Sequence, residues 1–177
     1  MPDDAARSSA ADDQASSADV APETPLAAPP RQRACVVTLG GRPFAVDVRQ
    51  TREVVMLEAL TAVPGAPAPL LGVANLRGSV VGVAEARPLL GLTPQPVAAG
   101  SPALVVAAGG LQAAVPIERV IGLDWFDVPN APADDSRPGA EFATGMIPHG
   151  GDFATLLDAG RLLGALCASW TPPASEA

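Results

Sequence analysis

The feature that most restricts how this chain can fold is an internal repeat. Residues 39–48 show a strand, a Gly-Gly turn and a second strand, and residues 108–117 show the same pattern. Farther along each half, residues 72–91 resemble residues 145–164, and both segments end in Leu-Leu-Gly. Each half therefore predicts five short strands followed by a short helical segment.

Short strands without a long helix are typical of a small closed β-barrel, because closure removes exposed edge strands. A barrel of about 65 residues has a marginal core by itself, whereas two packed barrels can share one. Residues 80–84 are apolar at consecutive positions, which indicates a strand covered on both faces. The sequence thus predicts an all-β protein of two intimately packed, five-stranded barrels with short helical segments.

The segments that flank the repeat differ from it in composition. Residues 1–33 are mostly Ala, Ser, Asp and Pro, with six acidic residues and three arginines. Such a segment cannot bury enough apolar surface to offset the entropy lost on ordering. We expect a disordered acidic tail over residues 1–33 and a folded domain over 34–170. The first barrel would span about 34–95 plus the C-terminal helix, the second about 101–158, and 171–177 would be loose.

Composition also argues against several classes of function. All 11 basic residues are arginines, so the chain has no lysine for a P-loop or a Schiff base. A formal net charge of −8 without a basic cluster argues against nucleic-acid binding. No apolar run reaches the roughly 18 residues of a membrane span, and the acidic N-terminus does not resemble a secretory signal. The two cysteines, Cys35 and Cys167, lie in apolar runs and suggest buried thiols, so we expect a cytoplasmic protein.

Catalysis is not expected. His149 is the only histidine, in a predicted turn between Pro148 and Gly150, and a solvated turn residue is the simpler interpretation. Its neighbours Asp152 and Thr144 do not form a nucleophile motif with it, and no cluster of metal ligands accompanies it. We therefore predict no catalytic residue, no metal site and no cofactor.

Four motifs follow one another in the first half of the chain. They are Val37-Thr38-Leu39-Gly40-Gly41, Thr51-Arg52-Glu53-Val54, Val63-Pro64-Gly65-Ala66-Pro67 and Gly72-Val73-Ala74-Asn75-Leu76-Arg77-Gly78. In this order they resemble CheW-like proteins, the coupling proteins of bacterial chemosensory systems, over about residues 34–168. The resemblance implies two SH3-like, five-stranded barrels around a shared apolar core, in agreement with the repeat.

The chain departs from the family pattern after Asn-Leu-Arg-Gly. The family usually continues with a Pro-Val-x-Asp-Leu strand, whereas this chain has Gly82-Val83-Ala84-Glu85-Ala86. Carboxylates are retained in kind at Glu85 and Glu118. The chain thus resembles a divergent member, which leaves open partners other than those of the main flagellar pathway.

Glu53 and Arg77 are charges placed where apolar strands should be uninterrupted. Each could be a solvated tip. We predict instead that they meet across the first barrel, bidentately if the geometry allows, and fix the angle of the hairpin at residues 75–79 beside a groove between the barrels. The other candidate interface residues are the turn residues Asn75 and Gly78 and an apolar strip of Val54, Leu76 and Val80, suited to a partner helix.

The resemblance implies a scaffold that couples the cytoplasmic tip of a chemoreceptor to the regulatory domain of a chemotaxis histidine kinase. Two alternatives stay open. One is a CheW-like adaptor of a pilus-motility or other non-flagellar chemosensory pathway. The other is a small ligand-binding barrel or hydrolase. A binding barrel needs a polar group inside an apolar cavity, and the sequence shows no strand of that kind.

Overall fold

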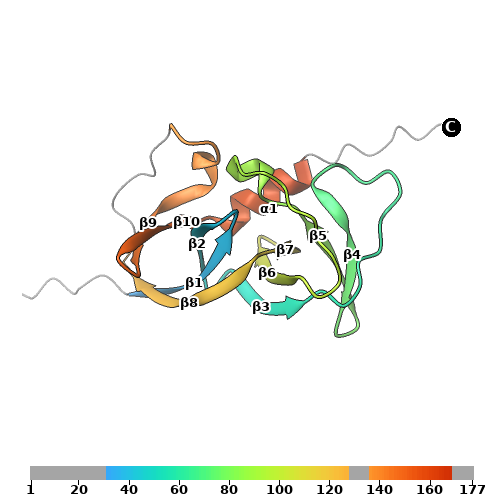
Figure 1. Ribbon diagram of the computed structural model, residues 1–177, viewed down its shortest axis with the longest axis horizontal. Helices are drawn as coiled ribbons and strands as arrows, with labels where there is room; N and C mark the ends of the chain where they lie inside the picture. The colour runs from blue at the N-terminus through green and yellow to red at the C-terminus, as the bar shows by residue number, and fades with distance from the viewer. Residues whose placement is uncertain (1–30, 128–135, 169–177) are drawn as a thin grey trace, which may run out of the picture.

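Ten short strands make up most of the folded part of the chain (Figure 1). The computed structural model describes residues 31–127 and 136–168. The elements are β1 (Gln32–Leu39), β2 (Arg42–Asp47), β3 (Thr51–Met56), β4 (Leu70–Leu76), β5 (Ser79–Ala84), the 3-10 turn η1 (Pro88–Leu90), β6 (Pro102–Ala108), β7 (Leu111–Pro116), β8 (Arg119–Phe126), η2 (Ala140–Phe142), β9 (Ala143–His149), β10 (Asp152–Leu157) and α1 (Ala159–Ala168).

The strands form two five-stranded sheets, which confirms the predicted all-β class. The terminal sheet has the order β8-β1-β2-β10-β9, and the central sheet, built from residues 51–116, has the order β3-β6-β7-β5-β4. Figure 1 shows the two sheets side by side, with α1 across their junction. The predicted tail up to residue 30 and the chain end from residue 169 lie outside the described residues. β1 already begins at Gln32, inside the segment expected to be tail.

The predicted barrel boundaries, 34–95 and 101–158, are wrong. Each sheet combines the Gly-Gly hairpin of one half with the last three strands of the other half. The exchange is made by two parallel pairings, β2 with β10 and β5 with β7, and by two antiparallel pairings, β1 with β8 and β3 with β6. After β7 the chain changes sheets within two residues: Ile117 N donates to Pro102 O, and Glu118 N donates to Thr38 O. Both arrangements contain the same strands, so local patterns could not distinguish them.

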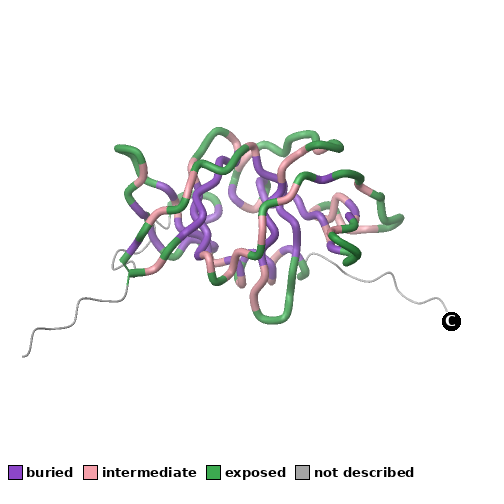
Figure 2. Tube along the Cα trace, turned by 90° about the horizontal axis from the view of Figure 1, so that it is seen from below, coloured by how far each residue is buried: buried purple, intermediate pink, exposed green. Residues whose placement is uncertain are grey.

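Three apolar clusters stabilise this arrangement. Each sheet forms one cluster from its own buried side chains. The largest cluster lies between the two sheets and includes residues of α1. β1 contributes to two of them, because Val36 points into the terminal sheet and Val37 into the shared core. Figure 2 shows this burial along the middle strands and exposure along the outer strands and turns.

Some burial predictions were wrong. Val80, expected to be covered, is exposed, although Val81 and Val83 of the same strand are buried. Cys35 is buried as expected, but Cys167 near the end of α1 is exposed. In the ranges 31–127 and 136–168, no helix is long and apolar enough to cross a membrane.

Candidate functional site

The turn between β4 and β5 carries Arg77 in an unusual backbone conformation. Arg77 has a φ of 51°, and it is the one non-glycine residue with a positive φ in the described part of the chain. A residue with a Cβ pays about 1–2 kcal/mol in this left-handed region. Gly78 follows with a φ of 88°, and its N–H donates to Asn75 Oδ1 at 2.8 Å. The turn therefore has local support from Asn75 and Gly78, but not from the arginine.

The predicted contact between Glu53 and Arg77 is present. Arg77 Nη2 lies 3.0 Å from Glu53 Oε2, and the two side chains are 83% and 32% exposed. The contact is not a bidentate fork, because Glu53 Oε2 is buried and accepts no hydrogen bond from the described residues. The pair connects β3 to the β4–β5 hairpin, and these are the two edges of the central sheet. An ion pair this exposed contributes less than about 1 kcal/mol to stability.

A groove of about 560 Å³ follows the seam between β3 and the β4–β5 hairpin. Its lining residues are Val54, Val55, Met56, Glu58, Asn75, Leu76, Arg77 and Gly78. The groove therefore lies at the edge of the central sheet, not between the two barrels as the sequence suggested. Five of the seven predicted interface residues line the groove. Glu53 is not a lining residue, but its side chain contacts the lining residue Arg77, and Val80 is exposed on β5 outside the groove. Val55, Met56 and Glu58 also line the groove but were not predicted.

The terminal sheet has a comparable seam. His149, at the end of β9, binds Asp124 of β8 through Nδ1 and Oδ2, so an ionisable pair again connects an edge strand to a hairpin. The prediction of a solvated turn histidine is wrong, since the His149 side chain is 20% exposed and paired. The sequence did not indicate Asp124, because it lies 25 residues away.

The other groups considered near His149 have different partners. Asp152 Oδ1 accepts the N–H of Phe153, and Thr144 Oγ1 donates to Leu156 O. Among the described residues, no group of three or more metal-ligating side chains is placed to hold an ion. The absence of catalysis and of a metal stays a prediction.

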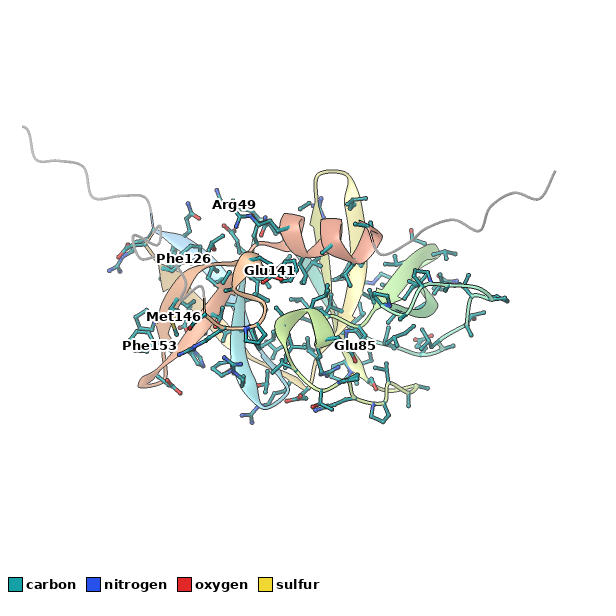
Figure 3. All side chains as sticks on the ribbon, turned by 90° about the horizontal axis from the view of Figure 1, so that it is seen from above. Arg49, Glu85, Phe126, Glu141, Met146 and Phe153 are labelled. Carbon is teal, nitrogen blue, oxygen red and sulfur yellow. The ribbon has the colours of Figure 1, made fainter. Side chains whose placement is uncertain are left out.

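Sequence reasoning missed a buried charge network between the sheets. Arg87 Nη1 donates to both carboxylate oxygens of Glu85 at 3.0 and 2.9 Å, and the two side chains are 3% and 4% exposed. Arg87 Nη2 lies 3.9 Å from Glu118, whose carboxylate accepts the N–H groups of Gly40 and Gly41. The network therefore connects the end of β5 to the β1–β2 turn of the other sheet. Figure 3 labels Glu85 in the interior of the molecule.

This burial changes the interpretation of the divergent strand. Glu85 and Ala86 are both buried. The departure from Asp-Leu at these positions therefore alters internal packing while a buried carboxylate is kept, and it does not alter an exposed contact surface.

Comparisons with known proteins agree with this architecture. A family model described as CheW-like domain matches residues 33–167. The crystal structure of the scaffolding protein TtCheW from Thermoanaerobacter tengcongensis superposes with a TM-score of 0.63. It is 19% identical, and the match covers 73% of this chain and 90% of that chain. No curated protein matches the sequence. The structural likeness supports the fold, and the family model extends over both sheets.

Proposed function

The chain belongs to the CheW-like domain family, and from that premise we propose that it is a non-catalytic scaffold coupling a chemoreceptor to a chemotaxis-type histidine kinase. In this proposal it acts in the cytoplasm, where the receptor tip and the kinase meet. It uses no cofactor, and its mechanism is to hold two partners in a fixed relative geometry.

We assign the receptor tip to the seam groove of the central sheet. The observation that carries this assignment is the exposed apolar wall of Val54 and Met56 beside a charged rim of Arg77 and Glu58. An amphipathic helix binds such a groove with its apolar face while its polar residues meet the rim. Exposed apolar side chains gathered at one place typically mark an interaction site.

We assign the kinase's regulatory domain to the outer face of the terminal sheet. That face exposes Leu123, Trp125, Met146 and Phe153. Figure 3 shows Met146 and Phe153 close together at the end of the molecule remote from the seam groove. Two separate apolar faces suit a protein that holds two partners at once.

The test compares two valine substitutions. Val54 in the groove and Val63 outside it are similarly exposed, at 42% and 38%. Val54→Asp should weaken binding of a soluble receptor-tip fragment at least about 10-fold, whereas Val63→Asp should leave it nearly unchanged. Fluorescence anisotropy with the labelled fragment measures both.

Binding of the kinase's regulatory domain provides the internal control, because Val54→Asp should not affect it. Equal losses for Val54→Asp and Val63→Asp would refute the groove as the receptor site. If the unmodified chain bound neither the receptor fragment nor the kinase domain, the scaffold function itself would be refuted.

A further inference from the structure

A pocket at the start of β1 gathers arginines in a chain that is acidic overall. The pocket has a volume of about 400 Å³, and its lining includes Arg31, Arg33, Arg49 and Trp125. Three of the 11 arginines thus lie around one indole ring. Figure 3 shows Arg49 near Phe126, which follows Trp125 in the sequence, at this end of the terminal sheet.

Hydrogen bonds hold part of this pocket in place. Arg49 Nε donates to both carboxylate oxygens of Asp47 at 3.1 and 3.0 Å, and its Nη2 donates to Gln32 Oε1 at 2.6 Å. Burial of Asp47 works to raise its pKa, but the hydrogen bonds and charge of Arg49 outweigh burial and hold that pKa below its ordinary value. Arg49 is therefore fixed in position although its side chain is 69% exposed.

Arg33 leaves a positive charge in the pocket without an opposite charge. Its guanidinium lies 5.4 Å from the centre of the Trp125 ring, and within residues 31–127 and 136–168 no carboxylate pairs with it. Arg31 has only a long contact with Asp127, at 3.7 Å. Trp125 itself is 60% exposed. The pocket thus offers a free guanidinium beside an accessible aromatic face.

The residues that precede Arg31 have the complementary chemistry. Residues 1–30 carry six carboxylates, one arginine and five prolines, so their formal charge is −5. Glu23 is eight residues before Arg31, and at about 3.3 Å per residue that length can return across the pocket. A segment covalently joined to the pocket is also present at a high effective concentration.

We propose that the acidic N-terminal segment, residues 1–30, binds back onto the Arg33–Arg49–Trp125 pocket of the same chain. Its carboxylates contact the guanidinium groups of Arg33 and Arg49, and its prolines pack against the Trp125 ring. The attraction between exposed charges weakens as salt is added. Bound in this way, the segment covers Trp125 and competes with any partner of that face. This last consequence rests on the proposed function, whereas the docking itself does not.

Paramagnetic broadening in the full-length chain tests the docking. A nitroxide is attached at Ser17→Cys in a Cys167→Ser background, in which the remaining Cys35 is buried. At low salt the indole N–H signal of Trp125, assigned by its loss in Trp125→Phe, should lose intensity relative to the reduced label. The intensity should return in high salt, and also when Asp12, Asp13, Asp19 and Glu23 are changed together to their amides.

Two arginine variants test the pocket. Arg33→Gln should abolish the broadening, whereas Arg42→Gln should retain it, since Arg42 lies at the opposite end of the β1–β2 hairpin. An unbroadened Trp125 signal in the full-length chain overturns the proposal. So does broadening that survives high salt and neutralised carboxylates. Broadening that arises only between a spin-labelled chain and a separate isotope-labelled chain would assign the pocket to a second copy, which overturns the intrachain form.

Discussion

Replacing Arg87 with methionine should destabilise the protein strongly. Both side chains of the Arg87–Glu85 pair are almost fully buried, and the Arg87 side chain provides two of the hydrogen bonds to that carboxylate. Loss of the guanidinium leaves the buried Glu85 carboxylate without its ionic partner. This should lower the free energy of unfolding by on the order of 3–5 kcal/mol. Because a typical domain is stable by only about 5–15 kcal/mol, the midpoint of urea unfolding should fall markedly.

A double mutant separates the charge from the packing. In Glu85→Gln/Arg87→Met the buried charge is gone, and the amide oxygen can still accept one of the two backbone N–H groups, from residue 87 or from Gln95, that bond to different oxygens of the Glu85 carboxylate. Its cost should therefore be smaller than that of Arg87→Met alone. Arg161→Met is the matched control, since that arginine has an exposed ion pair with Asp158 and should change stability by less than about 1 kcal/mol. A cost for Arg87→Met as small as that of the control, or a double mutant as unstable as the sum of the singles, would refute the reasoning.

Three further predictions follow from other parts of the structure. Arg77→Gly should leave stability unchanged or raise it by up to about 1 kcal/mol in urea unfolding, because glycine suits the positive φ, yet it should weaken receptor-fragment binding. Asp47 has a lowered folded-state pKa, so its contribution to stability is present above the ordinary value of 3.8 and lost as the pH falls through the folded value; Asp47→Asn should flatten the acid side of the stability–pH curve. A fragment of residues 34–95 should lack a cooperative thermal transition in calorimetry, because its hairpin pairs with β8 and β10 of the other half.

Much of the fold was predictable because duplication and turn chemistry are local. Gly40 and Gly41 have positive φ values of 56° and 72° at the β1–β2 turn, as the Gly-Gly pattern predicts. The exchange of hairpins between the halves was not predictable, because strand periodicity specifies which residues are buried but not which strand pairs with which. Parallel contacts such as Ala45 with Leu156 link residues more than 100 positions apart.

The charged pairs of the candidate site also differ in how far the sequence could predict them. Glu53 and Arg77 could be paired from the sequence because each is a charge that interrupts or adjoins an otherwise apolar run. Arg87 offered no such signal, since an arginine just after a strand is usually solvated. Only the fold shows that Glu85 and Arg87 face the interior, where Arg87 Nη1 donates to both carboxylate oxygens of Glu85.

The repeat also supplies an internal comparison for Arg77. In the equivalent hairpin, β9–β10, the two turn residues are Gly150 and Gly151, with φ values of 57° and 87°. These nearly equal the values of 51° and 88° at Arg77 and Gly78, so the two turns have closely similar φ angles. Glycine is therefore sufficient to build this turn, and the arginine adds backbone strain together with an exposed ion pair that contributes little stability. Since neither the turn nor the stability of the fold accounts for Arg77, we propose that its guanidinium contacts a partner at the rim of the seam groove.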